Sequence, residues 1–180
     1  MSYHEMPVRR INRYEGVVVS VRVDQARLSD GRLTLREVVE HPGGVAVLPL
    51  DTDGRVWCVR QFRYPFGREL LEIPAGKLEP GEDPAVCAAR ELSEETGFSA
   101  DSLRSLGCSY SSPGISTEVI HLFLATGLRP GPAHPDDGEL LGVEAHPLAE
   151  LVDAVLRGEL ADAKSVAAIL KTARLLEETE

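Results

Sequence analysis

The sequence predicts an α/β fold in which helices cover both faces of a mixed β-sheet. Segments with the composition of strands lie before and after one helix that begins near residue 84, and two further helical patterns lie near the C-terminus. Such layers bury the apolar faces of sheet and helices together. At 180 residues, the chain fits one main domain with a small terminal addition.

The N-terminal part predicts a pair of strands that precedes the main domain. Residues 16–23 are rich in β-branched side chains, Asp30-Gly31 marks a turn, and residues 33–39 alternate as a second strand. A two-stranded hairpin is marginally stable alone. We therefore expect residues 1–40 to form a small β appendage that contributes to dimerisation, and residues 41–180 to form the main domain.

The main domain carries further strand patterns and two C-terminal helices. A turn at Asp51–Gly54 predicts a hairpin between two of the strands. Residues 129–138 contain three prolines, two glycines and two aspartates, which predicts a mobile loop. The predicted strands cover residues 45–50, 56–62, 67–73, 103–110, 119–125 and 141–146, and the predicted helices cover residues 148–157 and 165–178.

The helix after Asp83 carries the chemistry. Asp83 is suited to the N-cap, Pro84 to the first helical position and Gly97 to the C-terminal cap. Glu91, Glu94 and Glu95 lie at i, i+3 and i+4, so their carboxylates crowd onto one face. Arg90 can reach Glu94 at i+4 and hold that carboxylate in place, or else form a simple surface ion pair. The alternative is a solvated acidic helix, but a divalent cation would explain why like charges are assembled. Carboxylate oxygens suit Mg²⁺ or Mn²⁺.

The whole stretch from Gly76 to Phe98 resembles the signature of the Nudix hydrolases, Gly-x5-Glu-x7-Arg-Glu-U-x-Glu-Glu-x-Gly-U with U apolar, and every position of that signature is met. By average residue frequencies, about one chain in ten million of this length would match by chance. The resemblance implies an α/β/α sandwich that hydrolyses nucleoside diphosphates linked to another group, with two or three Mg²⁺ or Mn²⁺ ions per site.

Local features outside this signature resemble the ADP-ribose pyrophosphatase branch. They are Val59–Pro65, Leu71–Gly76, Ser112–Gly114 and the tail Gly158–Ser165. The implied reaction is hydrolysis of the pyrophosphate bond of ADP-ribose or a related nucleotide sugar, giving AMP and ribose 5-phosphate from ADP-ribose. One alternative is a Nudix hydrolase of FAD, GDP-mannose or an oxidised nucleotide. A second is a module that senses a nucleotide without cleaving it, although such relatives usually lose glutamates of the Nudix signature.

The resemblance also implies residue roles. Glu91, Glu94 and Glu95 are the expected metal ligands, together with the carbonyl of Ala75, and Glu91 and Glu95 are expected to be catalytic. In the acidic loop, we favour Glu139 for the metal and Asp137 for the general base, although the reverse stays open and the loop could be merely solvated.

Substrate contacts are expected outside the signature. Arg63 is the expected phosphate ligand, since its fork of donors suits phosphate. Arg36 and Glu72 are weaker candidates for phosphate and ribose, or else structural ion pairs. Pro113 lies fifteen residues beyond Phe98, where the branch carries a proline, or is an ordinary turn proline.

Composition restricts the partners and the compartment. The net charge of −10 argues against a nucleic-acid groove, and no apolar run is long enough to span a membrane. Three widely spaced cysteines, expected to be buried, and the lack of a secretion signal predict a cytoplasmic enzyme. The expected partner is a nucleoside diphosphate-linked small molecule, and the expected assembly is a homodimer.

Overall fold

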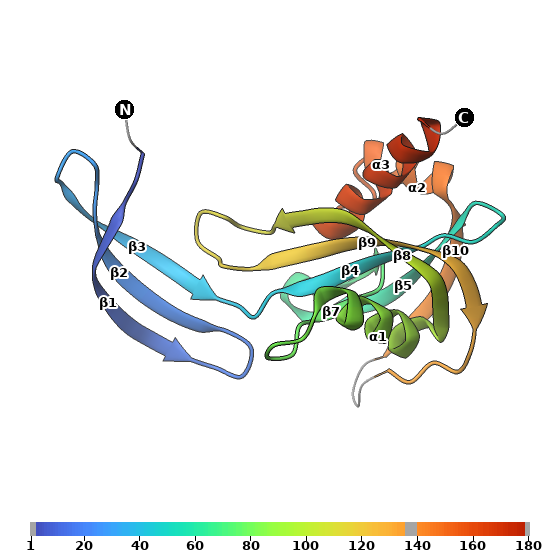
Figure 1. Cartoon of the computed structure of the whole chain (residues 1–180), viewed down its shortest axis with the longest axis horizontal. Helices are drawn as coiled ribbons and strands as arrows, with labels where there is room; N and C mark the ends of the chain where they lie inside the picture. Colours follow the sequence, from blue (N-terminus) through green and yellow to red (C-terminus); the bar gives the residue numbers. More distant parts are fainter. Residues whose placement is uncertain (1–2, 136–139, 179–180) are drawn as a thin grey trace. The chain divides into compact units, whose positions relative to one another are not determined.

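The computed structural model describes residues 3–135 and 140–178, and it divides into two compact units. One unit extends to Gly43 and includes Tyr110–Val119, and the other contains Gly44–Ser109 and the chain from Ile120 onward. Figure 1 labels most elements of both units. The boundary expected at residue 40 and a role of the appendage in dimerisation stay predictions.

The N-terminal unit contains a three-stranded antiparallel sheet, where the sequence predicted only two strands. The order is β1 (Met6–Glu15), β2 (Ser20–Arg27) and β3 (Leu33–Glu40). The predicted strand over residues 16–23 was wrong in part, because the Gly16 amide donates to the Val19 carbonyl at 3.0 Å and closes a turn there. The largely exposed β1 lacks the apolar alternation that marks a half-buried strand.

The segment Tyr110–Val119 joins this unit by pairing with the end of β3. The Val39 amide donates to the Ile115 carbonyl at 2.7 Å, and the Thr117 amide donates to the Val39 carbonyl at 3.0 Å. The loop expected between two strands of the main domain is thereby held to the N-terminal sheet.

The main unit is built on two sheets. A mixed sheet has the order β7 (Ala75–Lys77), β4 (Gly44–Pro49), β9 (Val119–Pro130) and β8 (Phe98–Tyr110), with β4 and β9 parallel. An antiparallel sheet has the order β10 (Leu141–Pro147), β5 (Arg55–Arg63) and β6 (Arg68–Glu72), and a 3₁₀ turn at Tyr64–Phe66 joins the last two.

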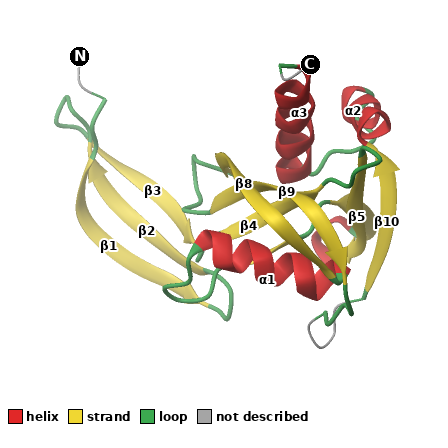
Figure 2. Ribbon diagram, turned by 45° about the vertical axis from the view of Figure 1, so that its right-hand side comes forward, coloured by secondary structure: helices red, strands yellow, loops and turns green. Residues whose placement is uncertain are grey.

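Helices cover both faces of the mixed sheet, as predicted. Figures 1 and 2 show α1 (Pro84–Thr96) along one face and α2 (Leu148–Leu156) and α3 (Ala163–Glu177) on the other. Successive side chains of β4 point to opposite faces of the sheet. Val45 and Val47 pack in the cluster with α1, and Ala46 and Leu48 pack in the cluster with α2 and α3. The result is an α/β/α sandwich.

Some local predictions were wrong. The turn before Gly54 forms, but it makes no hairpin of β4 and β5, because only Leu50 and Val56 bridge there and the two strands belong to different sheets. Cys58 and Cys87 are buried as expected, whereas Cys108 is exposed. None of the helices in the described chain has the length and apolar character needed to cross a membrane.

Candidate active site

The helix α1 has the caps that its sequence predicts. The Asp83 carboxylate accepts hydrogen bonds from the amides of Ala85 at 2.8 Å and Val86 at 3.4 Å, and Pro84 follows it. Gly97 closes the helix with φ of 74°, and its amide donates to the Ser93 carbonyl at 2.9 Å. These caps fix the start and end of α1, and so the register of its glutamates.

Arg90 is the centre of an ion-pair network on α1. Its Nη1 donates to Glu91 at 2.7 Å and to Glu94 at 2.9 Å, and its Nε donates to Glu82 at 3.0 Å. The predicted pairing of Arg90 with Glu94 is therefore confirmed, and it is one of three such pairs. A single guanidinium partly neutralises the crowded carboxylates that the sequence assembles.

Glu82 fixes the loop before α1. Its carboxylate accepts from the Glu79 amide at 3.0 Å as well as from Arg90. The hydrogen bond from Arg90, helped by that from the Glu79 amide, lowers the pKa of Glu82 to about 2. Hydrogen bonds to its carboxylates, first of all Glu82, likewise raise the pKa of Arg90.

Strand β7 lies directly against the carboxylates of α1. The Ala75 amide donates to Glu95 Oε2 at 3.0 Å. A Cβ on Gly76 would lie 1.9 Å from the carboxyl group of Glu91, so only glycine leaves room for this carboxylate. Glu91 is 9% exposed and Glu95 5%. The structure thus brings together four of the predicted ligands, Ala75, Glu91, Glu94 and Glu95, around the end of β7 and one face of α1.

These residues fit a hard divalent cation in their donor chemistry. Buried carboxylates and a backbone carbonyl are the oxygen ligands that Mg²⁺ accepts, and the space left by Gly76 is one that a Cβ would fill. Among the residues described, no three His, Cys, Asp or Glu side chains converge on one point. Glu91 and Glu94 turn instead toward Arg90. We therefore expect these carboxylates to reorient when a metal binds.

Two predicted substrate residues, Arg63 and Glu72, bind each other. The Nε and Nη2 atoms of Arg63 each donate to the Glu72 carboxylate at 2.7 Å. The pKa of Arg63 is raised, chiefly by these hydrogen bonds and further by the charges of Glu72 and Glu95, against the effect of burial. Arg63 therefore lies within electrostatic range of a carboxylate on α1.

Sequence reasoning missed Lys164, which forms an ion pair with the same Glu72 carboxylate. Burial acts most strongly on Glu72 and would raise its pKa, but the charges and hydrogen bonds of Arg63 and Lys164 outweigh burial and lower it. The signal was present in the tail Gly158–Ser165, which resembles the ADP-ribose pyrophosphatase branch without saying what its lysine contacts.

The remaining predicted residues belong to the N-terminal unit or lie outside the described residues. Arg36 is in β3 of the N-terminal unit, where its Nη2 donates to Glu5 at 2.7 Å in an exposed ion pair. Pro113 is in the turn of the same unit that follows β8. Asp137 and Glu139 lie outside the described residues.

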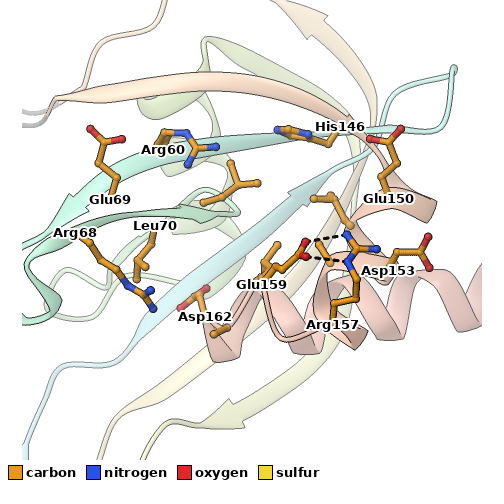
Figure 3. A pocket seen from close by; sticks show the side chains of 15 residues that line it. Arg60, Arg68, Glu69, Leu70, His146, Glu150, Asp153, Arg157, Glu159 and Asp162 are labelled. Atoms are coloured by element: carbon orange, nitrogen blue, oxygen red, sulfur yellow. Dashed lines mark hydrogen bonds and ion pairs between the residues drawn. The ribbon is translucent and has the colours of Figure 1, made fainter.

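A hollow of about 490 Å³ in the main unit is not this site, because the described residues that line it include none of the predicted site residues. Figure 3 shows the charged side chains that line it, with Arg157 bound to Glu159. Carboxylates outnumber arginines in its lining, which disfavours a diphosphate. The charged lining residues are Arg60, Arg68, Arg157, Glu69, Glu150, Asp153, Glu159 and Asp162.

Comparison with known proteins places this geometry in a family context. A NUDIX domain model matches residues 40–169. The ADP-ribose pyrophosphatase of Bacillus subtilis (strain 168) is 39% identical over 170 residues, covering 93% of this chain and 92% of that protein. The methanol dehydrogenase activator of Bacillus methanolicus is 37% identical over 169 residues, covering 93% and 91%. A crystal structure of an ADP compounds hydrolase shares the fold, with a TM-score of 0.87 at 22% identity over 99% of this chain and 98% of that one.

Proposed function

This chain belongs to the Nudix hydrolase family, and we propose that it hydrolyses the pyrophosphate bond of ADP-ribose or a related nucleotide sugar. ADP-ribose would give AMP and ribose 5-phosphate. The observation that carries this proposal is the complete set of Nudix-signature carboxylates on α1, with Glu91 and Glu95 buried against β7. Near-full-length similarity to an ADP-ribose pyrophosphatase supports the substrate class.

Nudix hydrolases use divalent metal ions, and we propose Mg²⁺ here, in two or three copies. Glu91, Glu94, Glu95 and the Ala75 carbonyl would hold the ions, with Glu139 as a further ligand. Bound metal would neutralise phosphate charge and lower the pKa of the attacking water. Asp137 is the proposed base that accepts the proton of that water, and Arg63 the proposed phosphate ligand.

The proposed enzyme acts as a homodimer in the cytoplasm. The N-terminal sheet supports the first point, because its two outer strands, β1 and β3, are largely exposed and offer a surface for a second copy, and β1 is an edge strand of that sheet. Light scattering at micromolar concentration should give about twice the chain mass of 19.6 kDa. A monomeric mass would contradict the dimer.

Turnover of a nucleotide panel tests the activity. ADP-ribose, GDP-mannose and FAD are each incubated with the protein and Mg²⁺, and the products are identified by chromatography. We expect ADP-ribose to be cleaved with the highest kcat/KM. A higher kcat/KM for FAD or GDP-mannose would mean that this compound, and not ADP-ribose, is the preferred substrate. Binding without cleavage would indicate a sensing module.

Glu95→Gln tests the catalytic site within the same assay. The substitution removes the charge of a carboxylate that the structure holds against Ala75, and we expect kcat to fall by about a hundredfold or more while the fold is retained. Glu150→Gln, on the exposed side of α2, is the matched control. Wild-type turnover by Glu95→Gln would remove this residue from the mechanism.

A further inference from the structure

Lys164, in the first turn of α3, lies between two carboxylates of the main unit. Its Nζ contacts Glu72 and lies 2.9 Å from the Oδ1 atom of Asp162. The side chains of Lys164 and Glu72 are 11% and 2% exposed. A buried carboxylate is costly unless it is paired, so this ammonium group has a strong influence on where the Glu72 side chain can lie.

Asp162 is itself fixed. As the N-cap of α3, its Oδ2 accepts from the Ser165 amide at 3.1 Å and from the Ser165 hydroxyl at 2.5 Å. The Ser165 hydroxyl in turn accepts from the Ile73 amide at 2.9 Å. The start of α3 is therefore bound to the residue that follows Glu72, and Lys164 is held on both sides.

Arg63 binds the same Glu72 carboxylate, and this pairing uses only part of its guanidinium group. Its Nε and Nη2 donate to Glu72, whereas Nη1 makes no hydrogen bond within the described part of the chain. The side chain is 34% exposed. The fork geometry of this pair fixes the plane of the guanidinium, and donors remain for an anion.

We propose that Lys164 is a positioning residue, which acts with Asp162 to hold Glu72 in the orientation that presents Arg63 to the diphosphate of the substrate. The inference rests on the proposed function, because it takes Arg63 as the phosphate ligand. Without Lys164, Glu72 has Arg63 as its one cationic partner among the described residues, and both side chains can rotate together. A small displacement of a binding group is enough to weaken the substrate complex.

The test compares Lys164→Met in two backgrounds, the wild type and Arg63→Gln, by steady-state kinetics with ADP-ribose. Lys171→Met is the matched control, since Lys171 lies in the same helix but donates to the Leu106 carbonyl at 2.8 Å. In the wild-type background we expect KM to rise about tenfold with kcat within about twofold, and Lys164→Arg to recover most of this loss.

In the Arg63→Gln background, Lys164→Met should change KM by less than about twofold, because the group that it positions is already gone. An equal fold-change in KM in both backgrounds, or an equal rise in KM with Lys171→Met, would overturn the proposal. If Lys164→Met does not fold, Asp162→Asn carries the same comparison, since asparagine can still cap the helix. If Asp162→Asn raises KM by at least about threefold in the wild-type background but not in the Arg63→Gln background, the proposal is supported. An unchanged KM in the wild-type background would overturn it.

Failure of the proposed function gives a different result. If the wild type does not cleave ADP-ribose, the substrate assignment fails, and crystal structures of the wild type and Lys164→Met then decide the positioning role. We expect Arg63 and Glu72 to leave their wild-type rotamers in the variant. An unchanged Arg63–Glu72 pair, with both N–O distances still 2.7 Å, would refute it.

Discussion

At the scale of single residues, the site depends on how closely β7 approaches α1. Gly76 has no side chain, and the Glu91 carboxylate occupies the space that a Cβ would need. The atoms in conflict are at the end of a flexible side chain. A substitution at Gly76 should therefore displace the carboxylate instead of breaking the fold.

Gly76→Ala is expected to lower kcat/KM by about a hundredfold, because a metal ligand moves, while the free energy of unfolding changes by less than about 1 kcal/mol. Steady-state kinetics and thermal unfolding measure the two quantities. Gly142→Ala is the control, since its Cβ would meet the nearest atom at an ordinary 3.7 Å. Normal activity of Gly76→Ala would show that the Glu91 carboxylate does not need the space beside Gly76 when it binds metal.

Glu82 provides a prediction about pH. Its pKa is about 2 in the folded protein and 4.5 ordinarily, so the folded state favours the ionised form. The stability it contributes is fully present above about pH 4.5 and is lost as the pH falls toward about 2. Glu82→Gln should flatten this part of the curve of unfolding free energy against pH. A curve as steep in Glu82→Gln as in the wild type would contradict the pairing with Arg90.

Residue-level predictions from the sequence succeeded where spacing was short. The i, i+4 pair of Arg90 with Glu94 follows from helix geometry and is confirmed. The contact of Lys164 with Glu72 joins residues 92 positions apart, and no local pattern encodes it. The fork of Arg63 on Glu72 was missed for a similar reason, because it depends on the pairing of β5 with β6.

At the scale of elements, α1 was the most predictable part of the chain. Its caps, its apolar stripe and its acidic face all follow from residues within one helix. Strand β7, with three residues, and the polar strand β1 have no comparable local signal. They form because partners offer unpaired backbone groups, and that information is not local.

The N-cap of α1 can be tested directly. Asp83→Ala removes the acceptor of the Ala85 and Val86 amides and should destabilise the protein by about 1 kcal/mol, a fall of about 2–4 °C in Tm. Asp83→Asn should retain most of the stability, because asparagine caps equally well. Calorimetry measures both. An unchanged Tm in Asp83→Ala would mean that the cap contributes nothing.

At the scale of the whole molecule, the layered architecture followed from the order of strand and helix patterns, but the sheet order did not. The parallel pairing of β4 with β9 and the separation of β4 from β5 bring together distant segments. The sequence likewise did not predict that Tyr110–Val119 belongs to the N-terminal unit. Non-local pairing of this kind is decided by the packing of the complete chain.

The central claim is that the α1 carboxylates bind a divalent cation together with a diphosphate. Isothermal titration of Mg²⁺ into the protein, saturated with a non-hydrolysable ADP-ribose analogue, tests it most directly. We expect uptake of two or three ions per chain, and loss of this uptake in the double variant Glu91→Gln with Glu95→Gln. Absence of Mg²⁺ binding by the wild type, or equal binding by the double variant, would show that these carboxylates are not the metal ligands.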